Sequence, residues 1–457
     1  MSNQSKYPTS LFSSNLTFTG ENENSGVLAI AGCSGEKLVK EFGSPLFVID
    51  QADFFLRAKS WRQVLDTSFG GGQLYYAAKS FICVEVAKWL KELKLGLDVC
   101  SAGELAVALA ADFPASDIEF HGNNKSESEI TTAIKAGVGT IVIDSFDEIT
   151  RVSDIAKSLN KTQKVYLRLT PGIDAHTHEF ISTAHEDVKF GFSIASGAAN
   201  EAIKKCMEQS SLNLTGIHCH IGSQIFEVDG FKAAAQRLVA VLATFRDKYS
   251  KELPELNIGG GYGIAYTKDE SAISPDVVIP AIASVIKDEC AKAKLALPRI
   301  SIEPGRAIVG PTTTTLYLVG TTKSVKLDNG SERRYISVDG GMSENIRPAL
   351  YGAVYSAFLA NRTSTAKLIS SRVVGKHCET GDILISEINL PSDIKAGDLL
   401  AIPATGAYGR SMASNYNHIS RPAVITVING SARVILRREN EQDLLNLDVD
   451  QPPRQIS

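Results

Sequence analysis

Eight short apolar segments recur along this chain of 457 residues, and most neighbouring segments are separated by enough residues for a helix. Strands and helices that alternate eight times predict a closed parallel (β/α)8 barrel. The segments span residues 74–79, 95–101, 117–123, 140–145, 165–171, 214–223, 256–263 and 300–306. Active sites of such barrels lie at the C-terminal strand ends. The first candidates for function are therefore the residues that end the segments: Lys79, His121, His220, Gly259 to Gly261, and Glu303 to Arg306.

The last third of the chain has a different pattern. After about residue 310 the apolar runs are short, rich in β-branched residues and bounded by turns, and Asn329-Gly330 and Asn429-Gly430 are strong hairpin signals. We therefore predict an α/β fold in which residues 45–310 form the barrel. Residues 1–44 and 311–457 are predicted to form a second, β-rich domain of sandwich or barrel type that completes the active site.

Composition and charge exclude several classes of function. The formal net charge is only −4, and no basic stripe typical of a nucleic-acid-binding protein is visible. No apolar run reaches the roughly 18–20 residues of a membrane span, and the polar N-terminus has no hydrophobic signal core. Seven scattered cysteines without a CxxC pair argue against a disulfide framework and a structural zinc site. We expect a soluble, cytoplasmic protein that binds neither nucleic acid nor membrane.

Two helix starts and one long loop stand out between the predicted strands. Ser101 is followed three residues later by Glu104, and Ser145 by Glu148, which is the pattern of a capping box. The connection at residues 172–193 is much longer than a usual strand-to-helix loop, and long loops in compact domains usually carry function. A lid over the substrate and a metal site both remain open for it, because it contains His176, His178 and His185.

Lys79 and the glycine runs each have two interpretations. Lys79 could be an ordinary lysine whose amine reaches solvent. If the amine is desolvated in a barrel mouth, its pKa falls and it becomes a nucleophile that forms an imine, as a pyridoxal phosphate enzyme requires. The glycines of 258–263 and 303–306 could simply make turns. Because they follow the last two strands, they could also bring backbone N–H groups to a phosphate.

Glu303 and the segment HCHIGS point to the same cofactor. Glu303 could be a cap or an ion-pair member, but a carboxylate that faces a pyridine nitrogen keeps it protonated and makes the ring a strong electron sink. His218 and His220 should lie on the same side of a strand, and His-x-His is also a metal-ligand pattern. No nearby cysteine or carboxylate clearly completes a metal site, so we expect no metal. We favour His220 as a ring stacked on a flat cofactor, with Ser223 at its phosphate.

Nine motifs, in order between about residues 45 and 435, resemble those of the diaminopimelate decarboxylase family. This family belongs to the barrel-type (fold-type III) pyridoxal phosphate-dependent decarboxylases, alongside the ornithine and arginine decarboxylases. One motif alone would be a weak signal, but nine in the same order are specific. The motifs are YYAAKS, DVCSAGEL, HGNNKS, HCHIGSQ, IGGGYGI, EPGR, DGGMSENIRPALYG, GKHCETGD and ATGAYG.

The resemblance implies a role for each matching residue. Lys79 would bind pyridoxal 5'-phosphate covalently, His220 would stack on its ring, and Glu303 would pair with its pyridinium nitrogen. Cys378 would reach over from the second subunit of a head-to-tail homodimer and protonate the carbon that has lost CO2. The residues that hold the cofactor phosphate would be Ser223, Gly261, Gly305, Arg306 and Tyr408. The substrate would contact Arg306, Arg347, Tyr351 and Tyr408, with Glu379 at its distal amino group.

The residues around Arg347 sharpen the choice of substrate. Arg347 and Tyr351 are four residues apart, so on a helix they would lie on one face. A guanidinium fork suits a bidentate carboxylate. Diaminopimelate carries a carboxylate at its distal centre, whereas ornithine carries only an amine. We therefore predict decarboxylation of meso-2,6-diaminopimelate to L-lysine and CO2, the last step of lysine biosynthesis.

Three alternatives remain open from the sequence. A related decarboxylase that acts on ornithine, arginine or carboxynorspermidine would share the cofactor-binding residues. A non-catalytic barrel that binds pyridoxal phosphate would keep Lys79 but would not need Cys378 or Arg347. A metal-dependent barrel hydrolase would use the histidines as ligands.

Overall fold

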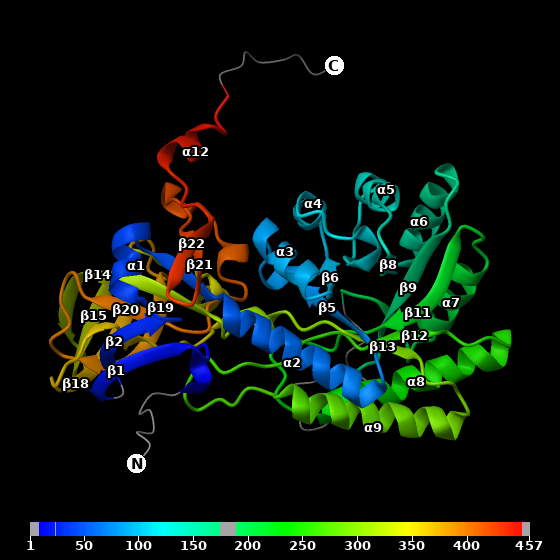
Figure 1. The fold of residues 1–457 in the computed structure, drawn as a ribbon, viewed down its shortest axis with the longest axis horizontal. Helices are drawn as coiled ribbons and strands as arrows, with labels where there is room; N and C mark the ends of the chain where they lie inside the picture. The colour runs from blue at the N-terminus through cyan, green and yellow to red at the C-terminus, as the bar shows by residue number, and fades with distance from the viewer. Residues whose placement is uncertain (1–8, 23, 174–188, 450–457) are drawn as a thin grey trace. The chain divides into compact units, whose positions relative to one another are not determined.

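The computed structural model describes residues 9–22, 24–173 and 189–449, and it contains the predicted parallel barrel (Figure 1). The chain divides into two compact units. The barrel unit comprises residues 55–264 and 271–308, and the β-rich unit comprises residues 1–54, 265–270 and 309–457. His176, His178 and His185 of the long loop lie outside the described residues.

Eight parallel strands form a closed ring, because β8 pairs with β9 as well as with β7. Each of the eight predicted segments overlaps one of these strands, so the predicted barrel is confirmed. A short strand, β10 (Phe192–Ser193), pairs with the C-terminal end of β9. The barrel strands are β5 (Gln73–Ala77), β6 (Gly96–Val99), β7 (Ile118–Phe120), β8 (Thr140–Ile143), β9 (Gln163–Thr170), β11 (Leu212–His218), β12 (Glu255–Asn257) and β13 (Arg299–Ile302).

The helices lie on the outside of the ring (Figure 1). The strands are buried from both sides: all four residues of β6 and of β8 are buried, as expected when helices cover one face and side chains fill the other. The helices are α2 (Gln51–Phe69), α3 (Val84–Glu92), α4 (Ala102–Ala110), α5 (Glu127–Ala136), α6 (Phe146–Ser158), α7 (Ala198–Met207), α8 (Asp229–Tyr249), α9 (Pro275–Ala293) and α10 (Arg306–Val309).

Both predicted caps begin a helix, but the carboxylates bond differently from a capping box. The Ser101 hydroxyl accepts from the Glu104 N–H at 3.2 Å, and the Ser145 hydroxyl accepts from the Glu148 N–H at 3.3 Å. Each glutamate carboxylate then accepts from the residue before the serine rather than from the serine itself. The exposed N–H groups of the first turn are satisfied in either arrangement. A full capping box, which the sequence analysis did not identify, starts α5 at Ser126.

The β-rich unit is built on one sheet of thirteen strands. Both Asn-Gly pairs form the predicted hairpins, β14–β15 and β21–β22. The strand at residues 46–50 joins this sheet, where it pairs with β14 and β21. The strands are β1 (Leu16–Asn22), β2 (Ser25–Ile30), β3 (Cys33–Ser34), β4 (Leu46–Asp50), β14 (Thr313–Lys326), β15 (Glu332–Val338), β16 (Phe358–Leu359), β17 (Asn361–Arg362), β18 (Leu368–Val374), β19 (Ile383–Pro391), β20 (Leu399–Ile402), β21 (Ala423–Ile428) and β22 (Ser431–Leu436).

Three short helices accompany this sheet: α1 (Gly35–Phe42), α11 (Arg347–Tyr351) and α12 (Glu441–Leu445). The sheet's core is aliphatic, with Leu28, Leu46, Leu316 and Ile425 all fully buried in one cluster. Among the described residues, no helix combines the length and the apolar character that a membrane crossing requires.

Candidate active site

Lys79 lies at the mouth of the barrel beside a buried carboxylate. It belongs to a single 3-10 turn (Ala78–Ser80) that directly follows β5. The Lys79 Nζ is 3.8 Å from Asp98 Oδ2 of β6, and the two side chains are 39% and 2% exposed. Burial raises the pKa of Asp98 to about 8, although the nearby Lys79 amine opposes this shift. The amine is therefore only partly in solvent and has one acidic neighbour with which it can share a proton.

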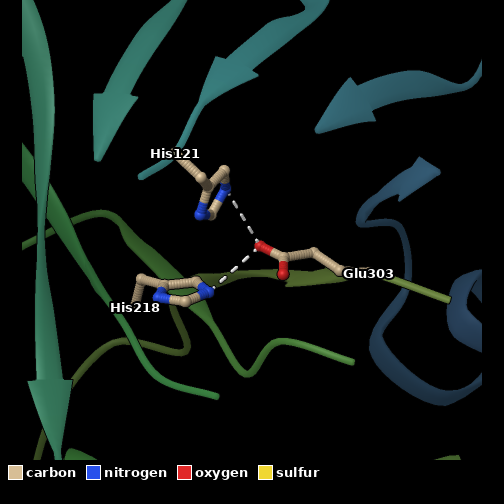
Figure 2. Close-up of side chains that lie close together, drawn as sticks. All are labelled: His121, His218 and Glu303. Carbon is tan, nitrogen blue, oxygen red and sulfur yellow. Dashed lines mark ion pairs between the residues drawn. The ribbon is translucent and has the colours of Figure 1, made fainter. Parts of the chain in front are cut away.

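Three barrel strands bring Glu303 together with two histidines (Figure 2). One carboxylate oxygen, Glu303 Oε1, is 3.1 Å from His218 Nε2 and 3.3 Å from His121 Nε2. All three side chains are buried. Burial lowers the pKa of both histidines, and the nearby Glu303 carboxylate opposes this shift. Burial alone would raise the pKa of Glu303, but the two histidines hold it well below its ordinary value, so Glu303 stays ionised.

Asn257, at the end of β12, links Glu303 to a second buried acid. Its amide donates to Glu303 Oε1 at 2.9 Å and to Glu119 Oε2 at 2.8 Å. Its own oxygen accepts from the Gly259 N–H at 2.8 Å, so the amide is fully hydrogen-bonded. Burial raises the pKa of Glu119 well above its ordinary value. Asn257 therefore bridges one ionised carboxyl group, that of Glu303, and one neutral carboxyl group, that of Glu119.

Sequence reasoning placed Lys79 and Glu303 at strand ends but missed the residues around them. Asp98 and Glu119 each interrupt an otherwise apolar strand, and Asn257 is a buried polar residue at the end of β12; these polar positions were the available signal. A polar side chain in a strand that is buried on both faces must find a partner inside the barrel. His218 was grouped with His220, and only the three-dimensional arrangement assigns it to Glu303.

A pocket beside His220 completes the barrel mouth. Burial lowers the pKa of His220 well below its ordinary value, and its Nδ1 is buried without a hydrogen-bond partner among the described residues. Behind it, Arg306 Nη2 donates to the Ser223 hydroxyl at 2.9 Å. Besides His220, the pocket is lined by Arg168, Thr170, Pro171, Gly172, Ile173, Phe190, Ile221, Gly222 and Ser223.

The glycine run after β12 brings two loops into backbone contact. Gly261 has φ +111°, and a Cβ on it would lie 2.3 Å from the carbonyl oxygen of Gly222. Only glycine permits this approach without displacing the loop that carries His220 and Ser223. Gly305, which follows Glu303, is buried. A Cβ there would lie 2.8 Å from the Ser80 hydroxyl, next to Lys79.

The β-rich unit holds the other residues that the resemblance assigned. Arg347, the first residue of α11, is only 7% exposed, and its Nη1 donates to the Tyr355 hydroxyl at 2.5 Å. Its guanidinium also lies 4.5 Å from the ring centroid of Tyr266. Tyr351 ends the same helix but is 65% exposed. The two side chains therefore lie in different environments, although they are four residues apart on a helix. Tyr408 is half-buried and has φ +60°.

Cys378 and Glu379 are both exposed, in the loop between β18 and β19. The Cys378 N–H donates to Asn417 Oδ1 at 3.0 Å. The Tyr416 hydroxyl donates to Glu379 Oε2 at 3.4 Å. Hydrogen bonds, first that from the Gly381 N–H, lower the pKa of Glu379, so a negative charge stands at the tip of the loop.

The barrel mouth fits pyridoxal phosphate. Two buried ring nitrogens there, His218 Nδ1 and His220 Nδ1, lack a hydrogen-bond partner among the described residues. Unpaired buried polar atoms are costly, so their concentration at one end of the barrel fits a polar ligand. The ligand atoms of His121, His218 and Glu303 also lie within 4.8 Å of one another, a spacing that could hold a metal ion. The expectation of no metal therefore stays a prediction.

Residues 52–310 match the family model described as "Pyridoxal-dependent decarboxylase, pyridoxal binding domain". The chain is 50% identical over 429 residues to the diaminopimelate decarboxylase of Mycobacterium tuberculosis, which covers 93% of this chain and 95% of that protein. The Bacillus subtilis diaminopimelate decarboxylase is 44% identical over 431 residues, covering 94% and 97% of the two chains.

The fold also matches solved structures. The crystal structure of diaminopimelate decarboxylase from M. jannaschii, in complex with L-lysine, has a TM-score of 0.88 at 29% identity and covers 96% of this chain and 99% of that one. The lysine/ornithine decarboxylase of Vibrio vulnificus is 21% identical with a TM-score of 0.70, which shows a shared fold alone. With half of its residues identical along nearly its full length, and with the barrel unit matched throughout, the chain belongs to the diaminopimelate decarboxylase family of pyridoxal-dependent decarboxylases.

Proposed function

We propose that this chain removes CO2 from meso-2,6-diaminopimelate and releases L-lysine, with pyridoxal phosphate bound at the barrel mouth. One observation carries the proposal: the same barrel holds a lysine amine beside a buried acid and, separately, an ionised carboxylate, Glu303. When bound, the cofactor supplies an electron sink for the charge that departing CO2 leaves behind.

Residues of the barrel unit would hold the cofactor. Lys79 binds it covalently, and Asp98 is the neighbour that exchanges a proton with the amine. Glu303 pairs with the ring nitrogen, because an ionised carboxylate stabilises a protonated pyridine. His220, a neutral ring, stacks on the cofactor. The phosphate contacts come from Ser223, Gly261, Gly305 and Arg306, joined by Tyr408 of the β-rich unit.

Arg347 supports diaminopimelate over ornithine as the substrate. Its guanidinium is buried and anchored by the Tyr355 hydroxyl, so it is fixed before a substrate arrives. A fixed, desolvated guanidinium binds a carboxylate strongly but cannot bind an amine. Arg306, Tyr351 and Tyr408 would complete the contacts to the L-configured end, and Glu379 would bind its amino group. Only the D-configured carbon is then placed to lose CO2.

Cys378 would donate the proton to that carbon, and it would do so in the active site of a second copy of the chain. Tyr351, Cys378 and Glu379 are all exposed in the single chain, where water competes for their contacts. A homodimer with active sites at its interface would cover them. A thiol is mostly protonated at neutral pH and can therefore act as an acid. The cytoplasmic location stays a prediction.

The test is Lys79→Ala, with Lys88→Ala as the matched control because Lys88 is exposed on α3. Lys79→Ala should lose the visible absorbance of the bound cofactor and all CO2 release from meso-diaminopimelate, whereas Lys88→Ala should retain both. Borohydride reduction of the wild-type enzyme, followed by peptide mapping, should place the label on Lys79. A label on another amine, or CO2 release by Lys79→Ala, would refute the proposal.

A further inference from the structure

A buried histidine lies directly beneath the exposed tip of the loop that carries Cys378. This loop, the Cys378 loop, comprises residues 375–382 between β18 and β19. Cys378 and Glu379 at its tip are exposed, but the His377 side chain next to them is 0% exposed. No role in binding or catalysis has been given to His377 above, and nothing in its sequence neighbourhood explains why an imidazole should be buried there.

One side of His377 is fixed by a carboxylate. His377 Nδ1 lies 2.9 Å from Asp382 Oδ2, and the same oxygen accepts from the His377 backbone N–H at 2.8 Å. The other oxygen, Oδ1, accepts from the Met342 N–H at 2.6 Å. Asp382 is 3% exposed. Three donors on one buried carboxylate fix its position, and the position of Asp382 in turn fixes which ring nitrogen of His377 carries the proton.

The flat face of His377 is fixed by a tyrosine. The His377 and Tyr416 rings are stacked, with centroids 5.7 Å apart and planes inclined by 3°. The Tyr416 hydroxyl continues to Glu379, and the next residue, Asn417, accepts the hydrogen bond from the Cys378 N–H. The segment that holds the ring therefore also holds both residues at the tip of the loop.

The base of the loop leaves no room for a different arrangement. A Cβ on Gly375 would lie 2.2 Å from the carboxylate of Asp382. The Gly375 N–H donates to the Asp382 carbonyl at 3.0 Å, and the Lys376 N–H donates to the Gly340 carbonyl at 2.9 Å. An exposed loop tip is normally among the most mobile parts of a protein. Here a packed and hydrogen-bonded base restrains it.

We propose that His377, oriented by Asp382 and stacked on Tyr416, is a positioning residue that holds the Cys378 thiol in the geometry for proton delivery. The inference rests on the proposed role of Cys378. Transfer of a proton to one face of a carbon requires a donor held in place, and a misplacement of about 1 Å can cost about 10²-fold in rate. A loop that lost its base would still contain the thiol but would present it in many orientations.

Two substitutions separate the two contacts of the ring. His377→Phe keeps a flat ring against Tyr416 but loses the donor to Asp382. His377→Asn keeps an N–H near the Nδ1 position but loses the stacked ring. Lys376→Ala is the matched control, because Lys376 is an exposed residue of the same loop. Each variant is first checked for cofactor absorbance and melting temperature, and Tyr416→Leu provides a second route if His377→Phe does not fold.

The reaction is then run in D2O, and the configuration of the deuterated carbon of the lysine product is measured. The wild-type enzyme and Lys376→Ala should give one configuration. His377→Phe should lower kcat by about 10²-fold, change KM little and give both configurations, because solvent replaces the thiol as the donor. In His377→Asn, both kcat and the preference for one configuration should lie between those of the wild-type enzyme and those of His377→Phe. A single configuration and an unchanged kcat in His377→Phe and Tyr416→Leu would overturn the inference.

Cys378→Ala distinguishes failure of this inference from failure of the proposed function. If Cys378→Ala retains the wild-type rate and a single configuration, the thiol is not the donor and both assignments fail. If Cys378→Ala gives both configurations while the His377 and Tyr416 variants do not, the thiol is the donor and only the role of His377 is refuted.

Discussion

The acids at the barrel mouth and several residues assigned in the β-rich unit differ strongly in their exposure to solvent. In the barrel unit, Asp98, Glu119 and Glu303 are each no more than 3% exposed, and neighbouring side chains already orient them. In the β-rich unit, Tyr351 is 65% exposed, and the tip of the Cys378 loop is also in solvent. Electrostatic interactions are strong in a buried site and weak in water. The comparison indicates that one chain pre-forms the cofactor site, whereas the proposed proton donor needs another surface to cover it.

The largest expected effect comes from mixing two variants, one without activity (Lys79→Ala) and one with little activity (Cys378→Ala). If Cys378 acts in the partner's active site, each active site combines Lys79 of one chain with Cys378 of the other. Each variant then lacks a residue that the other variant can supply. After random exchange of subunits, half of the dimers pair one of each variant and contain one intact site, so about a quarter of the wild-type activity should return.

The control for this experiment is a mixture of Lys79→Ala with the double variant Lys79→Ala/Cys378→Ala, which has no intact site in any combination. CO2 release is the measurement, and exchange is verified with differently tagged chains. No recovery in dimers that have exchanged would show that Cys378 and Lys79 act within one chain.

Arg347 tests whether the β-rich unit selects the substrate. Arg347→Ala should lower kcat/KM for meso-diaminopimelate by about 10³-fold, since removing one partner of a buried charged pair costs about 4 kcal/mol. Arg347→Lys should recover only part of this loss, because an ammonium cannot replace the guanidinium fork. Arg372→Ala is the matched control: its guanidinium also lies near a tyrosine, 5.6 Å from the Tyr335 ring. A loss of less than tenfold in Arg347→Ala would return ornithine-type substrates to consideration.

Two buried glutamates of the barrel should respond differently to the same substitution. Glu303→Gln removes a negative charge from the proposed partner of the ring nitrogen, so kcat should fall by about 10²-fold while the cofactor remains bound. Glu119→Gln replaces a group that burial keeps neutral, so kcat should change by less than about threefold. Steady-state rates and the absorbance of the bound cofactor measure both. Equal losses in the two variants would contradict the assignment of the charge to Glu303.

Much of the fold was predictable because it follows local patterns. Alternating apolar runs gave all eight barrel strands, and the Asn-Gly pairs gave both hairpins. The strand at residues 46–50 lies within the range that was predicted to form the barrel, but it pairs with β14 and β21 of the β-rich unit. A strand's sequence shows that it is buried, and says little about which sheet buries it, since pairing depends on contacts far along the chain.

Candidate site residues could be predicted only where their position along the chain indicated a role. Lys79 and Glu303 stood out because they end strands. Asp98 and Asn257 were missed because their roles arise from neighbours on other strands, and Glu303 lies 46 residues from Asn257 in sequence. His377 was missed for the same reason, because Tyr416, which stacks on it, belongs to a distant segment.

The buried acids of the two units also differ in the direction of their pKa shifts, and these shifts make stability depend on pH. Glu344 of the β-rich unit is 1% exposed and accepts from the Gly341 N–H at 2.5 Å and from the Ser343 hydroxyl at 3.1 Å. Burial raises its pKa from 4.5 to about 7, the opposite direction to Glu303, which two histidines hold low. The difference teaches that burial raises the pKa of a carboxyl group, and that the two histidines reverse this shift at Glu303.

An effect on stability rather than on activity follows from this opposite shift. Because the folded protein binds the Glu344 proton more tightly than the unfolded chain, the contribution to stability is complete below pH 4.5 and is lost as the pH rises through about 7. Glu344→Gln cannot ionise, so it should gain up to about 3 kcal/mol relative to the wild type between these limits. Melting temperatures across this range measure the gain, with exposed Glu387→Gln as the control. Parallel profiles for the wild type and Glu344→Gln would mean that folding does not raise the pKa of Glu344, and the contrast with Glu303 would then be lost.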